Sequence, residues 1–319
     1  MKVLITGGFG FIGSEFIRMS IEGELKGFQP TQISIVDKLT YAGDLSRLQG
    51  YLDNPKLSYS ISDINNLALM KEQISDSDLV IHFAAESHVD RSIEDSDAFL
   101  ETNLMGTARI SKIARVLKKR LIVISTDEVY GSILKGSADE DFLLNPSSPY
   151  SASKAGGDLM AIAEVKTHKA EILITRCTNN YGKFQNVEKL IPLTISNLFY
   201  EKQVPVYGTG NQERDWISTR DHCRAIARVA LDGTPGHIYN IGRDMQVKNI
   251  DLVNAIANIM NVKYQYISYV EDRLAHDFRY AVNSEKIKKD LSWEPIDDIA
   301  SDLPDLVKHY TELFENQRF

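Results

Sequence analysis

The chain has 319 residues, enough for one or two domains, and its 43% hydrophobic and 25% charged residues are typical of a globular protein. A formal net charge of −8 argues against general binding to nucleic acids or to anionic membranes, although a local basic pocket for a small anion is compatible with it. The two cysteines, Cys177 and Cys223, show neither metal-ligand spacing nor a disulfide framework, so the sequence favours a reducing cytoplasm and no metal site.

The chain carries no sign of a membrane segment. "MKVLITGG" at its start reads as a short strand followed by a glycine turn, so we expect no signal peptide. No apolar run along the chain reaches the roughly 18 residues that a membrane helix needs. We therefore expect a soluble protein.

The first half of the chain alternates strand-like and helix-like segments. Short, mostly apolar segments rich in Ile and Val are typical of strands buried on both faces of a parallel sheet. We expect such strands at 2–6, 32–37, 57–61, 79–85, 120–125 and 171–176, with helices between them that include 11–21, 94–117 and 150–167. The alternation predicts right-handed βαβ units and a doubly wound parallel sheet of the Rossmann type.

After about residue 177 the alternation weakens. Short strand-plus-turn pieces such as "PVYGTGN" and "HIYNIGRD" lie among helix-like segments at 187–200, 220–231 and 249–260. No linker separates the two halves of the chain. We expect a sheet domain at 1–177, a smaller mixed α/β region at 178–319, and a return to the first domain at about 215–245.

A glycine-rich loop follows the first strand. In "TGGFGFIGS", Gly7, Gly10 and Gly13 are spaced three residues apart just before the first helix. Glycines there permit a tight turn and let a pyrophosphate approach the backbone and the N-terminus of the helix. Asp37 ends the second strand, 24 residues beyond Gly13, where a carboxylate can hold ribose hydroxyls and repel a 2′-phosphate. This pattern predicts a dinucleotide site and favours NAD over NADP.

Two adjacent carboxylates follow the strand at 120–125. Asp127 and Glu128 come directly after Thr126 in "STDEVYGS". Such a pair could serve only solubility, or one acid could donate a proton while the other accepts one. The residues by themselves leave both interpretations open.

Tyr150 and Lys154 stand one helical turn apart in "PYSASK", so they share a helix face. A lysine ammonium beside a phenol favours the phenolate and lowers its pKa. The phenolate could then take a hydroxyl proton while NAD accepts hydride from the same carbon. Tyr-x-x-x-Lys is common by chance, but after a dinucleotide loop it indicates a hydride-transfer site.

With these residues in place, the chain resembles the extended short-chain dehydrogenase/reductase family, and in particular its nucleotide-sugar 4,6-dehydratases. "STDEVYGS" is the most specific segment, because sugar-nucleotide 4-epimerases of the same family usually lack the acid pair. The similarity runs almost end to end through "VDKLTYAGDL" (36–45), "HFAAESHVDRSI" (82–93), "STDEVYGS" (125–132), "SPYSASKAGGD" (148–158), "NNYGKF..EKLIP" (179–192), "ERDWI" (213–217), "YNIG" (239–242) and "DRLAHDFRYA" (272–281).

The resemblance implies a reaction and a catalytic set. The expected substrate is dTDP-glucose, which would be oxidised at C4, lose water across C5 and C6, and receive the hydride back at C6. Thr126 would hold the C4 oxygen, a protonated Asp127 would protonate the departing C6 hydroxyl, and Glu128 would remove the C5 proton. A neighbouring carboxylate in an enclosed pocket raises the pKa of an acid, as this role of Asp127 requires. Tyr150 and Lys154 would complete the set.

The resemblance also implies the binding residues. The NAD site would be lined by Gly7, Gly10, Phe11, Ile12, Gly13, Asp37, Lys38, Thr40, Asp63, Ile64, Ala84, Ala85, Thr102, Tyr150, Lys154 and Asn180. Arg214 and Lys189 suit a diphosphate, because arginine offers a planar fork of donors and lysine a point charge. The nucleotide sugar would contact Ser87, Thr126, Asn179, Lys189, Leu190, Tyr207, Arg214, Asn249 and His276.

Several alternatives remain open. Departures from the family pattern at Lys183, Asn186, Val187, Arg243 and Ala275 all lie in the substrate half, so a UDP-, CDP- or GDP-hexose is a second candidate substrate. A 4-epimerase or decarboxylase would leave Asp127 unexplained. A non-catalytic NAD-binding protein would have no need for the catalytic set. By family analogy alone, helices at 102–118 and 150–167 are expected to pair across a homodimer.

Overall fold

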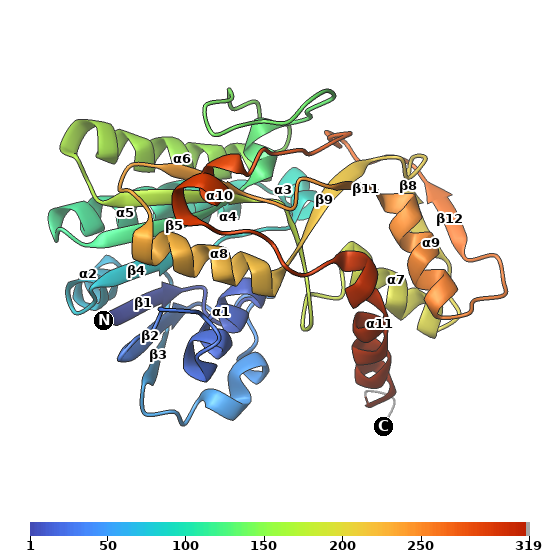
Figure 1. Cartoon of the computed structure of the whole chain (residues 1–319), viewed down its shortest axis with the longest axis horizontal. Helices are drawn as coiled ribbons and strands as arrows, with labels where there is room; N and C mark the ends of the chain where they lie inside the picture. Colours follow the sequence, from blue (N-terminus) through green and yellow to red (C-terminus); the bar gives the residue numbers. More distant parts are fainter. Residues whose placement is uncertain (317–319) are drawn as a thin grey trace.

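A computed structural model of the chain describes residues 1–316. Its main sheet has seven strands, every neighbouring pair of them parallel, in the order β10-β6-β5-β4-β1-β2-β3 (Figure 1). The bounds of these strands are β1 (Lys2–Thr6), β2 (Gln32–Asp37), β3 (Leu57–Ile61), β4 (Leu79–His82), β5 (Arg120–Thr126), β6 (Ile172–Cys177) and β10 (Ile238–Ile241). The predicted doubly wound parallel sheet is confirmed.

The six strands expected in the first half are all present, but β4 is shorter than predicted. It ends at His82, whereas the apolar run continues through Ala85. Phe83 still donates its backbone N–H to the carbonyl of Thr6 before β1 turns away at Gly7. Beyond that point the apolar side chains line a cavity rather than a sheet face.

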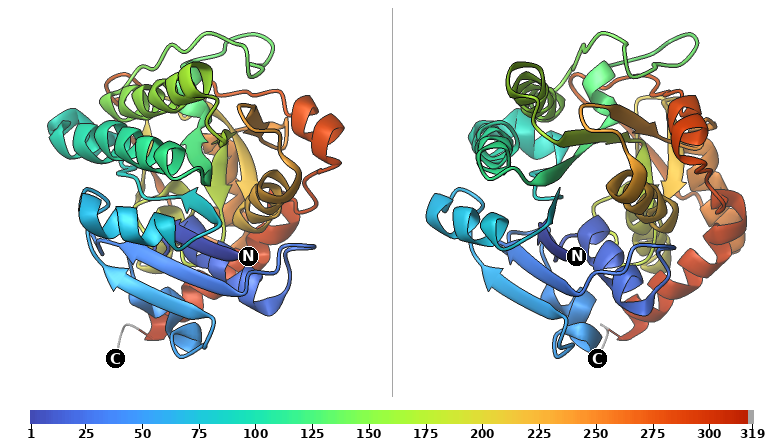
Figure 2. Two further views of the ribbon diagram at one scale, coloured as in Figure 1. Left: turned by 90° about the vertical axis from the view of Figure 1, so that its left-hand side faces the viewer. Right: turned by 60° about the vertical axis from the view of Figure 1, so that its left-hand side comes forward.

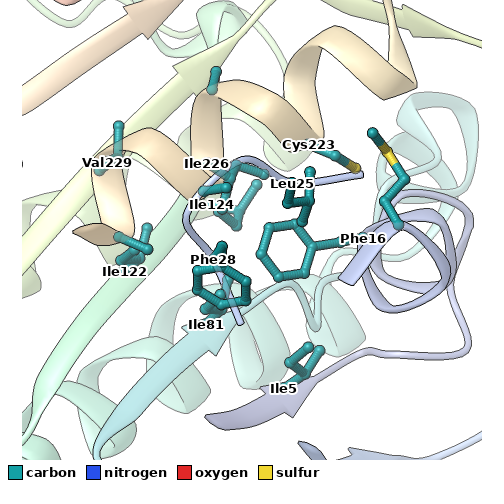
Figure 3. Close-up of a cluster of buried hydrophobic side chains, with 14 of the residues drawn as sticks. Ile5, Phe16, Leu25, Phe28, Ile81, Ile122, Ile124, Cys223, Ile226 and Val229 are labelled. Atoms are coloured by element: carbon teal, nitrogen blue, oxygen red, sulfur yellow. The ribbon is translucent and has the colours of Figure 1, made fainter. Parts of the chain in front are cut away.

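Helices cover both faces of the sheet. On one face α1 (Phe11–Glu22) packs against α8 (Thr219–Asp232). Figure 3 shows the apolar core beneath these helices, in which the rings of Phe16 and Phe28 meet edge to face at 5.2 Å between centroids. The opposite face carries α2 (Leu67–Ser75), α5 (Thr107–Val116) and α6 (Pro149–His168), and Figure 2 shows α5 and α6 side by side.

The helix expected at 94–117 is present from Asp97 to Val116, but it is not a regular α-helix along that length. The chain instead forms α3 (Val89–Glu94), an extended residue at Asp95, α4 (Asp97–Phe99), a π-helical turn η2 (Leu100–Gly106) and then α5. The wide π-turn places Asn103 inward, where its amide both accepts from the backbone N of Glu86 and donates to its O, each at 2.9 Å. It also donates to Ser153 Oγ of α6 at 3.0 Å. Helical periodicity does not reveal such a turn, which often occurs at functional sites.

Several segments after residue 177 build a second apolar core, separate from those of the main sheet. That core lies among α7 (Leu190–Phe199), α9 (Asn249–Ile259) and α11 (Ile299–Asn316), which contact one another. Two small sheets adjoin it: β11 (Gln246–Lys248), β9 (Glu213–Ser218) and β7 (Asn179–Tyr181), and β12 (Ile267–Val270) with β8 (Val204–Tyr207).

The segments at about 215–245 contribute to both parts of the molecule. β9 lies in a small sheet, whereas α8 packs on α1 and β10 pairs with β6 in the main sheet. α10 (Glu285–Leu291) lies against β10. The division of the chain into two domains stays a prediction. Among residues 1–316, no helix is both long enough and apolar enough to cross a bilayer.

Candidate active site

Three adjoining cavities follow the carboxyl ends of the main-sheet strands. We call them the first, central and outer cavities, with volumes of about 90, 250 and 230 Å³. The first and central cavities share Gly7 and Gly10 as lining residues, and the central and outer cavities share Glu128 and Lys189. The three therefore form one continuous groove at the edge of the sheet where ligands of open α/β folds bind.

The glycine loop brings backbone close to backbone at the inner end of this groove. Gly7 has φ +71°, and a Cβ built on it would lie 2.6 Å from the backbone N of Ala84. A Cβ on Gly13 would lie 2.4 Å from the carbonyl O of Gly7. Gly10 precedes α1 and provides no side-chain cap, so the first N–H groups of that helix remain available to an anion. These features fit a dinucleotide pyrophosphate.

The first cavity has an acid on each side. Asp37 at the end of β2 accepts from the backbone N of Phe9 at 2.9 Å and from that of Leu39 at 2.8 Å, which fixes its carboxylate. Lys38 Nζ pairs with Asp63 Oδ2 at 2.7 Å, so its charge is already partnered. Although burial acts to raise the pKa of Asp63, the Lys38 ammonium lowers it overall. This cavity brings together Gly7, Gly10, Asp37, Lys38, Thr40, Asp63, Ile64, Ala84, Ala85 and Thr102.

The central cavity collects the five residues expected to be catalytic. Thr126 ends β5 and caps the short 3-10 helix η3 (Asp127–Tyr130), accepting from the backbone N of Glu128 at 3.3 Å. The first turn of α6, held by a capping box that begins at Ser148, carries the tyrosine and lysine. The cavity is lined by Thr126, Asp127, Glu128, Tyr150 and Lys154, together with Phe11, Ile12, Gly13 and Asn180 from the expected NAD set.

Asp127 is a buried acid in a setting that favours its protonated form. Its side chain is 3% exposed, and Thr126 Oγ1 donates to its Oδ1 at 3.2 Å. Burial raises its pKa well above the ordinary value, and the nearby charges of Glu128 and Asp215 raise it further. Within residues 1–316 its Oδ2 has no hydrogen-bond partner. A carboxyl whose neutral form is favoured, at a residue that lines the cavity, is suited to proton donation.

Glu128 is placed between the two larger cavities. Burial raises its pKa, while the cationic groups of Arg214 and Lys189 partly offset this. Tyr280 Oη lies 3.4 Å from its Oε2. A carboxyl whose pKa is raised toward neutrality is a stronger base than an exposed one.

The expectation that Lys154 lowers the pKa of Tyr150 is wrong for the polypeptide by itself. Burial raises the pKa of Tyr150 well above its ordinary value, and the Glu128 carboxylate adds to the effect. Lys154 Nζ donates to the carbonyl O of Ile124 at 2.7 Å, and burial lowers its own pKa. The cost of burying a phenolate therefore exceeds the attraction of the lysine charge.

The outer cavity combines cationic and aromatic side chains. Lys189 Nζ donates to the carbonyl O of Ser87 at 3.2 Å. The guanidinium of Arg214 lies 4.2 Å from the ring centre of Tyr280. His276 Nδ1 contacts Asp272 Oδ1 at 2.6 Å. The cavity is lined by Ser87, Asn179, Lys189, Leu190, Tyr207, Arg214, Asn249 and His276, while Thr126 lines the central cavity instead.

Sequence reasoning did not select two further residues of the outer cavity, Arg273 and Tyr280. Arg273 lies 5.0 Å from the ring centre of Tyr207, and its Nε pairs with Asp90 Oδ1 at 2.6 Å. Both residues lie close to His276 in "DRLAHDFRYA". Because His276 was a predicted site residue, this closeness in sequence could have identified them. The ion pair between Arg273 and Asp90 joins segments far apart in sequence, so no local pattern could have predicted it.

The sequence model of the GDP-mannose 4,6 dehydratase family matches residues 4–302. The chain belongs to this family. It is 42% identical to a dTDP-glucose 4,6-dehydratase of Streptomyces niveus over 313 residues, which covers 98% of this chain and 93% of the relative.

Solved structures of family members share the fold closely. A dTDP-glucose 4,6-dehydratase of Streptomyces venezuelae, crystallised with NAD and dTDP, is 41% identical, with a TM-score of 0.95 and coverage of 98% of this chain and 97% of that chain. The enzyme of Bacillus anthracis, in complex with NAD, is 37% identical, with a TM-score of 0.90 and coverage of 99% and 98%.

Proposed function

We propose that this protein binds NAD and converts dTDP-glucose to dTDP-4-keto-6-deoxyglucose. The observation that carries the proposal is the adjacent pair Asp127 and Glu128, which stands where the central and outer cavities meet. Burial raises the pKa of Asp127 and favours its protonated form, and Glu128 borders both cavities. Relatives about 40% identical over nearly the full chain are dTDP-glucose 4,6-dehydratases, in agreement with this chemistry.

The residues of the first and central cavities fit NAD: the Gly7–Gly13 loop would hold its pyrophosphate and Asp37 its adenosine ribose. When bound, NAD would supply a nicotinamide that holds the hydride between its removal from C4 and its return to C6, and a positive charge that favours the phenolate of Tyr150. Lys154, placed one turn along α6, would hold the ribose hydroxyls close to that phenol.

The first task of the polypeptide is to take the proton of the C4 hydroxyl. Tyr150, once ionised, accepts this proton. Thr126 Oγ1 would turn its single proton from Asp127 Oδ1 to the C4 oxygen and so hold that oxygen near the phenol. The product of this step is a C4 ketone, which makes the hydrogen on C5 acidic.

The second task is the loss of water. Glu128 takes the C5 proton, and the carbon–oxygen bond at C6 breaks as Asp127 gives its proton to the departing hydroxyl. One water leaves, Glu128 is protonated and Asp127 is ionised. After C6 has been reduced, Glu128 returns a proton to C5. Tyr150 has gained one proton and Asp127 has lost one, so release from the phenol and uptake by the carboxyl restore both groups without a net change in protons. The raised pKa of each acid suits its role, because an ordinary Asp would already be ionised at neutral pH.

The outer cavity would hold the rest of the nucleotide sugar. Lys189 and Arg214 supply positive charge for the diphosphate in a protein whose net charge is negative. Asn179 and Asn249 offer amide groups, and Tyr207 offers an aromatic face. We place the nucleotide at the Tyr207 and His276 end, because the sugar must reach Glu128.

The direct test is to incubate the purified protein with dTDP-glucose and follow the 4-keto sugar by its absorbance in alkali. UDP-, CDP- and GDP-hexoses in parallel reactions test the second candidate, since the departures from the family pattern lie in the substrate half. Turnover of dTDP-glucose well above that of the others supports the proposal. An unchanged dTDP-glucose pool with NAD present would refute it.

We also propose a homodimer, a cytoplasmic location and the two-domain division at residue 177. Large apolar side chains remain exposed along neighbouring helical elements: Leu100 and Met105 on η2, Val116 on α5, and Leu159 and Met160 on α6. Such a patch is typical of an association surface, and the chain mass of 35.9 kDa makes a dimer easy to recognise by light scattering. Both cysteines are free and buried, which suits a reducing compartment.

A further inference from the structure

A row of hydrogen-bonding side chains connects Glu128 to the surface. Tyr280 Oη lies 3.4 Å from Glu128 Oε2 and donates to Asp277 Oδ2 at 2.9 Å. Ser147 Oγ donates to the other oxygen of Asp277, Oδ1, at 2.7 Å. Tyr280 is 6% exposed and Asp277 is 7% exposed, whereas Ser147 is exposed to solvent. The row therefore begins at Glu128, the expected base, and ends at the solvent-exposed side chain of Ser147.

Glu128 needs such a path when ligands are bound. Its carboxyl borders the central and outer cavities, which the cofactor and the nucleotide sugar would fill. Water then loses access to Glu128 from the cavity side. Tyr280 lines the outer cavity, whereas Asp277 and Ser147 do not, so the row passes from the cavity wall toward the loop that contains Ser147.

The row is held in a fixed geometry by its neighbours. The guanidinium of Arg214 lies against the ring of Tyr280, and its Nη2 donates to the carbonyl O of Asp277 at 2.8 Å. The backbone N of Tyr280 donates to the carbonyl O of Glu213 at 3.2 Å. Two groups therefore restrain Tyr280 and Asp277, as proton transfer along a short chain of donors and acceptors requires.

We propose that Tyr280, Asp277 and Ser147 form a proton relay that lets Glu128 exchange its proton with solvent while both cavities are filled. The proposal deepens the function proposed above and rests on it. Glu128 remains the group that takes the C5 proton. The relay decides whether the proton later returned to C5 is the original one or one from water.

The proton shifts are balanced. Protonated Glu128 gives its proton to Tyr280 Oη as the Tyr280 hydroxyl gives its own to Asp277 Oδ2, so the phenol stays neutral throughout. A hydroxyl can accept and donate at once, as this double shift demands. Asp277 then loses a proton to water beside Ser147, and the reverse sequence delivers a solvent proton to Glu128. Burial and the Glu128 charge raise the pKa of Tyr280, which agrees with a phenol that does not ionise.

The test uses dTDP-glucose that carries deuterium at C5, incubated with the holoenzyme in ordinary water. The product is trapped by borohydride reduction and its C5 deuterium is measured by mass spectrometry. The wild type should replace most of the deuterium with protium. Tyr280→Phe removes only the relay hydroxyl, and retention of deuterium per product molecule should rise severalfold. Retention is a ratio within the product formed, so a general loss of activity does not change it.

Asp277→Asn repeats the test at the next residue of the row. Its amide can still accept from Tyr280 but cannot carry the proton onward, so retention should rise here too. Tyr266→Phe is the matched control: Tyr266 Oη donates to Asn254 Oδ1 at 3.0 Å, neither residue lines any of the three cavities, and the variant should retain as little deuterium as the wild type.

The outcomes separate the relay from the proposed function. Failure of the wild type to dehydrate dTDP-glucose would refute the function itself. Dehydration with unchanged deuterium loss in Tyr280→Phe and Asp277→Asn would overturn the relay alone. Absence of any product from both variants would also overturn it, because the relay sets the source of the C5 proton and leaves its removal to Glu128.

Discussion

Arg47 Nη2 donates to Asn186 Oδ1 at 2.6 Å, although 139 residues separate the two in sequence. Arg47 belongs to η1 (Leu45–Tyr51) and also donates to the carbonyl groups of Phe9 and Ala42, at 2.8 and 2.6 Å. Asn186 and Ala42 both line the central cavity. This contact therefore joins the glycine-loop side of the groove to the 183–190 segment across the expected cofactor site.

Loss of this contact should weaken cofactor binding. Asn186→Ala removes one charge-assisted hydrogen bond, worth about 1.5 kcal/mol or more, so the Kd for NAD should rise by roughly tenfold. Calorimetric titration of the apoprotein with NAD measures the change. Asn258→Ala, on the exposed side of α9, is the control and should leave the Kd unchanged. Equal affinities in all three proteins would show that the contact does not retain NAD.

Asp127→Asn should separate oxidation from water loss. The variant keeps the shape of the side chain but has no acidic proton, so dehydration should slow by about 10²–10⁴-fold. Oxidation at C4 does not use Asp127 and should persist, visible as reduced nicotinamide in a single turnover. The exposed Asp139→Asn is the matched control. Water loss at the wild-type rate would remove Asp127 from the role of acid.

The ion pair between Arg176 Nε and Asp158 Oδ2, 2.9 Å long, lies almost wholly inside the protein. Asp158→Ala leaves the guanidinium buried without its counter-ion and should lower the free energy of unfolding by about 3–5 kcal/mol. Urea denaturation monitored by circular dichroism tests this. Asp76→Ala breaks the exposed pair with Lys2 and should change the free energy of unfolding by less than about 1 kcal/mol. Similar effects of the two substitutions would contradict the prediction.

Asp215 makes a defined contribution to the pH dependence of stability. Burial raises its pKa from 3.8 to about 7, although backbone N–H groups of Asp244 and Arg243 oppose the rise. Between these values the folded protein binds more protons at this site than the unfolded chain, so this carboxyl lowers stability as pH increases. The full effect is present above about pH 7 and disappears below about pH 4.

Asp215→Asn should remove that contribution. Relative to wild type, the variant should gain stability as pH rises from 4 to 7, with a limiting slope of about 1.4 kcal/mol per pH unit. Unfolding midpoints in urea across this range provide the measurement. Parallel stability curves for the two proteins would mean that Asp215 has the same pKa in the folded and unfolded states.

The amino-acid sequence alone determined the parallel sheet and most of its strands. Strands such as 32–37 and 120–125 are mostly apolar and rich in Ile and Val, and the helix at 150–167 begins at a clear start signal, so local composition is sufficient. The glycine spacing and the Thr126–Asp127–Glu128 run are also local patterns. They indicated the NAD site and the acid pair because the residues that act together are neighbours in the chain.

Only the tertiary structure decided which distant residues meet. The pairing of Arg47 with Asn186, the row from Glu128 to Ser147, and the contacts of Asn103 in the π-helical turn η2 all join segments far apart in sequence. The pKa of Tyr150 was predicted in the wrong direction for the same reason: proximity to Lys154 is visible in the sequence, whereas burial is not. Desolvation of a charged group depends on everything packed around it, and only the folded chain defines those surroundings.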